Sequence, residues 1–293
     1  MDLITKRYLY LEIHHAIEDS INIARNKQEP DYIAALVTYL PTQLSSILHH
    51  HIPGTQFRVG GCFIHQKPLA RFCNANPVNI KAPEIGDLLV VYKETTTSGN
   101  IYYNALILQA KKAHDIYNSP VSHSDTHQLR LYTEWPKFKY ERAGALNGLV
   151  RGVNPKTITP GAQYLLINES NRNWHPVSPC TLLCAKPDNV LVASNSLVHQ
   201  LINFIEFQTG KPFVSKSRNI DHWSKMIWDL LDISATAVFN RRNSGFNNYP
   251  RTAGDILNIL ANYTEENHVN VDNDSVGISI LYIERDDSVE QRD

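Results

Sequence analysis

Apolar residues in the first fifty positions recur every three or four residues, which is the spacing of one face of an α-helix. This spacing predicts an amphipathic helix over residues 5–27 and a second helix from Pro30 to about His50. Pro53 and Gly54 come next, and such a pair is typical of a helix end. The chain is therefore expected to begin with two helices before any strand.

Beyond Gly54 the pattern changes to the short apolar runs and alternations of β-strands. Three strands are predicted in succession, over residues 56–65, 86–94 and 100–112. The glycine pair at 60 and 61 indicates a β-bulge in the first of them. The sequence TTTSGN between the second and third predicts a tight turn, so these two strands should form an antiparallel hairpin.

The rest of the chain mixes helical and strand-like patterns. Predicted helices cover residues 126–135, 196–210, 222–239 and 252–263, and predicted strands cover residues 162–168, 181–185 and 276–284. A helix between strands implies a crossover, so the sheet should be mixed. We therefore expect an α/β fold with a mixed sheet flanked by helices. Residues 1–175 would form the core with its N-terminal helices, and residues 176–293 a mostly helical extension packed on it.

Composition narrows the class of protein only slightly. The 293 residues carry a net charge of −1, so any nucleic-acid-binding surface must be a local patch. Because the chain lacks a membrane-length apolar run and a signal-peptide pattern, we expect a cytoplasmic protein with no membrane span. Cys180 and Cys184 have a spacing that zinc sites use, whereas Cys62 and Cys73 lie in apolar runs typical of buried cysteines.

The first candidate for chemistry is Gln109-Ala110-Lys111 at the end of a predicted strand. The chain contains 14 lysines, and only Lys111 has Asp, Glu or Gln two residues before it. Residues two apart on a strand share a face, so Gln109 and Lys111 should point the same way. The alternative is a strand that ends at the surface with its polar residues solvated.

Asp87 interrupts the preceding strand in the same way, in Gly86-Asp87-Leu88. The midpoint of positions 87 and 109 is residue 98, which lies in the turn TTTSGN. In a hairpin centred there, Asp87 lies opposite Gln109, and Lys111 joins them at one end of the sheet. A slip of one residue in this register would separate the three side chains. The alternative for Asp87 is a residue that only caps a turn.

These groups suit a hard divalent cation. The Asp87 carboxylate, the Gln109 amide oxygen and the backbone carbonyl of Ala110 are the oxygen ligands that Mg²⁺ or Mn²⁺ prefers. Such a cation polarises a phosphodiester and activates a bound water. Lys111 is placed to orient that water or to stabilise charge on the phosphate.

This pattern, Asp87 followed by Gln109-x-Lys111 on the next strand, resembles the D…(E/Q)xK signature of the PD-(D/E)xK nuclease superfamily. Downstream, Gln128-Leu-Arg-Leu-Tyr132 resembles the Q-x-x-x-Y motif of its RecB-like branch. The resemblance covers about residues 30–170 and implies a restriction-endonuclease-like fold. It further implies that Gln128 and Tyr132 contact the DNA strand or the lysine. Their alternative is an ordinary amphipathic helix.

Further residues near the site are candidates for supporting parts. Lys112 could contact the phosphate. His65, at the end of the first predicted strand, could face the metal or the phosphate, but its favoured interpretation is a structural histidine. Glu84, three residues before Asp87, would support the site from outside the metal ligands, and its alternative is a loop charge. Members of the superfamily often add a glutamate from the helix before the sheet. In this chain the choice is among Glu12, Glu18 and Glu29. The chain departs from most members by carrying glutamine at position 109, which removes a charge from the metal site and should weaken its affinity for a cation.

A basic stretch with interleaved aromatic residues follows the site. Its basic residues are Lys111, Lys112, His114, Lys137, Lys139, Arg142 and Arg151, and its aromatic residues are Trp135, Phe138 and Tyr140. This mixture suits a phosphate backbone with stacked bases. A solvated surface with the aromatic residues in the core explains it equally well.

The sequence thus predicts a Mg²⁺-dependent DNA nuclease. The chain has no phosphate-binding loop of the ATPase type, so an ATP-driven step would need a helicase or ATPase partner. The resemblance makes a role in bacterial anti-phage defence an expectation, and a homo-oligomer is also possible. The alternatives are a catalytically inactive nuclease fold that binds DNA, or a scaffold subunit of a larger complex.

Overall fold

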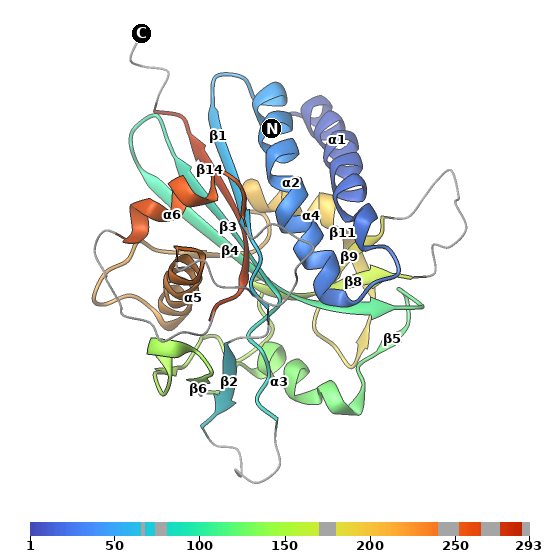
Figure 1. The fold of residues 1–293 in the computed structure, drawn as a ribbon, viewed down its shortest axis with the longest axis vertical. Helices are drawn as coiled ribbons and strands as arrows, with labels where there is room; N and C mark the ends of the chain where they lie inside the picture. The colour runs from blue at the N-terminus through green and yellow to red at the C-terminus, as the bar shows by residue number, and fades with distance from the viewer. Residues whose placement is uncertain (66–67, 74–80, 170–179, 240–251, 265–275, 289–293) are drawn as a thin grey trace.

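The computed structural model describes residues 1–65, 68–73, 81–169, 180–239, 252–264 and 276–288 (Figure 1). The α-helices are α1 (Leu3–Ile21), α2 (Glu29–His51), α3 (Thr126–Glu134), α4 (Leu197–Ile205), α5 (His222–Phe239) and α6 (Ile256–Thr264). Three 3₁₀ turns are η1 (Asn22–Ala24), η2 (His123–Asp125) and η3 (Gly144–Leu146). The strands are β1 (Gln56–Cys62), β2 (Leu69–Phe72), β3 (Leu88–Thr95), β4 (Ile101–Ala113), β5 (Ser119–Pro120), β6 (Phe138–Glu141), β7 (Val150–Arg151), β8 (Ala162–Asn168), β9 (Leu182–Ala185), β10 (Val190–Leu191), β11 (Ala193–Ser196), β12 (Lys211–Phe213), β13 (Thr252–Gly254) and β14 (Ser279–Asp286).

A nine-stranded mixed sheet forms the centre of the molecule, as the α/β expectation required. Its order is β11-β9-β8-β4-β3-β14-β1-β13, and β12 pairs with the first part of β4. The β4–β8 and β3–β14 pairs are parallel, and the remaining pairs of the sheet are antiparallel. Short strands form two further small sheets, β10-β5 and β2-β6-β7.

The C-terminal part of the chain is woven into the same sheet. Strand β14 lies between β3 and β1, near the middle of the sheet, and β9, β11, β12 and β13 add further strands. The expected division at residue 175 therefore does not coincide with a break in the sheet. The prediction of a strand at β14 is confirmed. Its sequence does not reveal its neighbours, because its partners β3 and β1 lie far away along the chain.

Two layers of helices cover the sheet. Helices α1, α2 and α4 pack on one face, with strand residues such as Leu88, Val90 and Leu108 beneath them. Helices α3, α5 and α6 lie on the other face, over residues such as Leu89, Val91 and Ile107. Alternate residues of each strand thus enter different cores, which explains why β3 reads as a continuous apolar run. No helix in the described part of the chain is both long and apolar enough to cross a membrane.

The β3–β4 hairpin has the predicted register. Leu88 pairs with Leu108 and Thr95 pairs with Ile101, so each pair is symmetric about residue 98. The turn is closed by hydrogen bonds between the main chains of Thr96 and Asn100 and of Gly99 and Thr96. This register places Asp87, the residue before β3, opposite Gln109.

The bulge expected at the glycine pair of β1 is absent. The pairing of β1 with β14 runs without a shift from Gln56 to Cys62. A Cβ atom at Gly60 would lie 2.4 Å from the main-chain nitrogen of Ile256, and one at Gly61 would lie 2.0 Å from the carbonyl oxygen of Val37. The two glycines therefore permit helices α6 and α2 to approach opposite faces of β1 closely.

The segment expected to be one helix over residues 252–263 is divided. Thr252–Gly254 forms β13, which pairs with β1 at the edge of the sheet, and α6 begins only at Ile256. Backbone pairing with β1, which lies far away in the sequence, overrides the local helical pattern here.

Candidate active site

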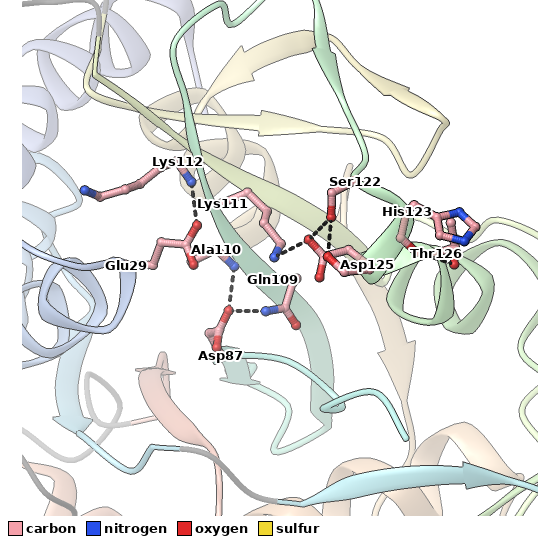
Figure 2. A network of polar contacts seen from close by, with 11 residues as sticks. Glu29, Asp87, Gln109, Ala110, Lys111, Lys112, Ser122, His123, Asp125 and Thr126 are labelled. Carbon is pink, nitrogen blue, oxygen red and sulfur yellow. Dashed lines mark hydrogen bonds and ion pairs between the residues drawn. The ribbon is translucent and has the colours of Figure 1, made fainter. Parts of the chain in front are cut away.

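The candidate site lies where the β3–β4 hairpin opens. Asp87 directly precedes β3, and its main-chain N–H donates to the carbonyl oxygen of Leu108 at 2.9 Å. Its carboxylate oxygen Oδ2 accepts from the Gln109 amide nitrogen at 2.5 Å and from the Ala110 main-chain N–H at 2.7 Å (Figure 2). The predicted convergence of Asp87 and Gln109 is therefore confirmed.

Strand β4 runs on to Ala113, beyond Leu108, which pairs with the first residue of β3. Along this last part of β4, acidic side chains occupy the side on which β3 would otherwise pair. Because main-chain groups alternate along a strand, Ala110 and Lys112 direct theirs to the same side as Leu108. The N–H of Ala110 donates to Asp87, and the N–H of Lys112 donates to Glu29 Oε1 at 2.8 Å. The same alternation directs the Ala110 carbonyl oxygen toward this acidic side.

Glu29 is the helix-borne glutamate at the site. It is the first residue of α2, where N–H groups at the helix start favour a negative charge. The other two glutamates are engaged elsewhere. Glu12 pairs with His51 at 2.9 Å, and Glu18 accepts from the main chain and the hydroxyl of Thr181. The sequence could not choose among them, because the choice depends on how α2 docks on the sheet.

Several carboxyl groups are crowded together at the site. Burial raises the pKa of Asp87 to about 8, and the charges of Glu84 and Glu29 act in the same direction. The Ala110 N–H and the Lys111 ammonium oppose this shift without cancelling it. Burial also raises the pKa of Glu84, against the charges of Lys81 and Lys111. Carboxyl groups held together in this way are typical of sites that bind a cation or transfer a proton.

The Lys111 ammonium contacts Asp125 and not Asp87 (Figure 2). Its ammonium lies 3.0 Å from Asp125 Oδ2, an oxygen that also accepts from the Ser122 hydroxyl at 3.0 Å. Asp125 ends the 3₁₀ turn before α3 and stands at the N-cap position of that helix. Asp125 was not among the residues predicted from the sequence, where its only local signal is an acidic residue just before a predicted helix.

Lys112 does not share that environment. Its ammonium pairs with Glu169 at 2.7 Å, and the His114 ring lies 3.5 Å from the same carboxylate. Lys112 therefore serves the site through its main-chain N–H, which holds Glu29, while its side chain is engaged with Glu169. The expected phosphate contact by its side chain would require that ion pair to open.

The Q-x-x-x-Y helix supports the site from the inside. Tyr132 is fully buried, and its hydroxyl donates to the carbonyl oxygen of Ile85 at 2.7 Å. A Cβ atom at Gly86 would lie 3.1 Å from that hydroxyl, so the main chain passes close to the ring just before Asp87. Gln128 is 5% exposed. The predicted contact of these two residues with a DNA strand does not fit their burial, and Tyr132 instead holds the turn that presents Asp87.

His65 and Glu84 lie at the borders of the site. Burial lowers the pKa of the partly buried His65, against the charge of Asp31 in the first turn of α2. The Phe63 ring stacks on the His65 ring at 6.3 Å between centroids. These surroundings match the structural alternative for His65. Glu84 forms an isolated β-bridge with Leu69, and its charge raises the pKa of Asp87.

The aromatic residues of the basic stretch belong to the core. Trp135, Phe138 and Tyr140 are at most 1% exposed. Arg151 forms two hydrogen bonds with Asp229, which also accepts from the Tyr140 hydroxyl. The aromatic side chains are thus explained by core packing and are not available to stack on bases, whereas Lys137, Lys139 and Arg142 are exposed.

The donor set at Asp87 fits a hard divalent cation. Gln109 is 8% exposed, and its Oε1 atom is buried without a hydrogen-bond partner. Together with the Asp87 and Glu29 carboxylates and the Ala110 carbonyl, it offers oxygen ligands only. Within the described ranges, no three His, Cys, Asp or Glu side chains are grouped closely enough to hold a metal by themselves. The amide and main-chain oxygens are therefore required, and the zinc alternative at Cys180 and Cys184 gains no support.

The chain was compared with known proteins. No protein-family model, no curated protein sequence and no solved structure matches it.

Proposed function

We propose that the chain is a metal-dependent DNA nuclease of the PD-(D/E)xK type. The observation that carries the proposal is the open end of the β3–β4 hairpin, where Asp87 and Gln109 lie side by side and Lys111 follows on the same face of β4. The glutamate at the start of α2 completes an acidic cluster there. The spacing of these polar residues on neighbouring strands is the spacing expected of a restriction-endonuclease-like core.

Each residue has a defined part in such a reaction. Asp87, Glu29 and the oxygens of Gln109 and Ala110 would hold Mg²⁺ or Mn²⁺, which supplies Lewis-acid activation of the phosphodiester and of a water. Lys111 would stabilise negative charge on the phosphate, since its ammonium is partly exposed beside the cluster. Tyr132 keeps the Ile85-Gly86-Asp87 turn in place, so that the carboxylate does not have to reorganise.

A partner protein belongs to the same proposal. The chain carries no ATPase loop, so a nuclease that acts on unwound DNA would depend on a separate helicase or ATPase subunit. Defence against foreign DNA is one setting in which such a pair would work.

A second candidate function is an inactive nuclease fold that binds DNA or joins a complex as a scaffold. Two contacts favour it. The Gln109 amide donates a hydrogen bond to the Asp87 carboxylate and so takes the place of a cation beside it. Lys111 is paired with Asp125 and is therefore not free to contact a phosphate. A module of this kind needs no cation for its structure or its binding.

Cleavage of supercoiled plasmid and of linear single-stranded DNA, with and without Mg²⁺ or Mn²⁺, distinguishes the two. The wild type is compared with Asp87→Asn and Lys111→Met, which preserve size, and with Asp232→Asn as a control. Asp232, on α5, forms an ion pair with Lys216, so this variant removes the same charge outside the proposed site.

A nuclease requires cation-dependent cutting that falls by at least about a hundredfold in both site variants and persists in the control. DNA binding without cutting under any cation would favour the inactive module. Cutting that survives both site substitutions would mean that the chemistry lies elsewhere.

A further inference from the structure

The Lys111 ammonium forms an ion pair with Asp125, with 3.0 Å between Nζ and Oδ2. Among the described residues, no ion pair joins Lys111 to Asp87 or to Glu84, although its charge acts to lower the pKa of both carboxyl groups. The contact with Asp125 therefore keeps the ammonium out of direct contact with the acidic cluster.

Asp125 is built to hold the lysine in that direction. Burial disfavours its charged form, but the hydrogen bond and the charge of Lys111, together with Ser122, outweigh this and lower the pKa of Asp125. The Ser122 hydroxyl donates to the same oxygen that accepts from Lys111, which limits rotation of the carboxylate. The side chains of Lys111 and Asp125 are 27% and 29% exposed, so the ion pair is partly screened by water.

We infer that Asp125 is a positioning residue, which draws the Lys111 ammonium away from Asp87 and so keeps the acidic cluster open to a divalent cation. The inference rests on the proposed function for the identity of the cation site. It concerns cation binding, however, and does not depend on whether the chain cleaves DNA. Without Asp125, the ammonium would turn to the carboxylates of Asp87 and Glu84 and compete there with the cation.

A double-mutant cycle tests this mechanism. Mn²⁺ binding to the full chain is measured by calorimetry and by electron paramagnetic resonance for the wild type, Asp125→Asn, Lys111→Met and the double variant. Asp125→Asn is expected to weaken Mn²⁺ binding about tenfold, and the same change in the Lys111→Met background to alter it less than about twofold. Asp232→Asn, which breaks the Lys216 ion pair, controls for the loss of one negative charge.

A spectroscopic readout separates positioning from a general loss of structure. The Lys111 ammonium signal in a lysine side-chain NMR spectrum is assigned by its absence in Lys111→Met. It should shift in Asp125→Asn and recover toward the wild-type position in Asp125→Glu, which restores the charge. Unchanged signals from the other lysines would show that the fold is preserved.

The outcomes are distinct. If Asp125→Asn weakens Mn²⁺ binding equally in the wild type and in Lys111→Met, Asp125 acts on the cation through its own charge. That result would overturn the inference but not the cation site. No Mn²⁺ binding by the wild type would overturn both the inference and the proposed function. Binding with the expected coupling, but without DNA cleavage, would uphold the inference and refute the nuclease.

Discussion

Replacing Asp87 by asparagine should stabilise the cation-free protein at neutral pH. In the folded chain the pKa of Asp87 is raised to about 8, whereas an unperturbed aspartate has a value of 3.8. Between these values the unfolded chain releases the proton that the folded chain retains. The free energy of unfolding contributed by Asp87 therefore falls as pH rises from about 4 to about 8.

The magnitude follows from the size of the shift. One pKa unit corresponds to about 1.4 kcal/mol, so a shift of this size costs at most about 5–6 kcal/mol above pH 8 and about 4 kcal/mol at pH 7. Asp87 is partly exposed, so water screens part of this cost. A realistic gain for Asp87→Asn is about 2 kcal/mol at pH 7.5. The asparagine oxygen can still accept from Ala110 and Gln109, which preserves the two hydrogen bonds.

The assay is urea unfolding of both proteins from pH 4.5 to pH 8.5 in the presence of a chelator. The stability difference between Asp87→Asn and the wild type should grow with pH and level off near pH 8. Substitution of the exposed Asp188 by asparagine is the control, and its difference should stay flat. Adding Mg²⁺ should then stabilise the wild type but not Asp87→Asn, because a ligand that binds only the folded state raises its stability.

A stability difference that does not change between pH 5 and pH 8 would refute the reasoning. It would mean that Asp87 is ionised in the folded protein at neutral pH and that the negative charges of Glu84 and Glu29 are already compensated. An asparagine variant that is less stable than the wild type at pH 8 would lead to the same conclusion.

Three further predictions concern the surroundings of the site. Gln109→Glu adds a negative charge to the donor set and removes the amide that donates to Asp87. Calorimetry should show about tenfold tighter Mn²⁺ binding by this variant. In the presence of a chelator, the variant should lose about 1–2 kcal/mol of stability at pH 8. Tyr132→Phe leaves the buried carbonyl of Ile85 without its partner, which should cost about 1–3 kcal/mol in urea unfolding and lower cleavage, whereas an unchanged stability would contradict the anchoring role. Gly61→Ala would place a Cβ atom 2.0 Å from the Val37 carbonyl oxygen and should cost at least about 3 kcal/mol in thermal unfolding, whereas Gly152→Ala, with its nearest neighbour at 3.9 Å, should be mild.

Features that depend on neighbouring residues could be predicted from the sequence. The hairpin register followed from the turn at residue 98 and from polar residues placed symmetrically around it, and the structure has that register. Helix α5 and strand β8 have the predicted bounds, because uninterrupted helical and apolar patterns of that length leave little choice. Asp87, Gln109 and Lys111 were found for the same reason, since one hairpin contains all three.

Features that depend on contacts between distant segments were decided only by the tertiary structure. Glu29 was selected over two other glutamates by the docking of α2 on the sheet, and Asp125 meets Lys111 only because η2 and α3 return to that face. Tyr132 has a buried anchoring role because the turn before β3 passes over its ring. A residue's own sequence neighbourhood cannot encode such contacts, because their energies depend on burial and on partners that folding brings together. The sequence alone thus determined the hairpin and its polar residues, and the tertiary structure decided which charges surround them.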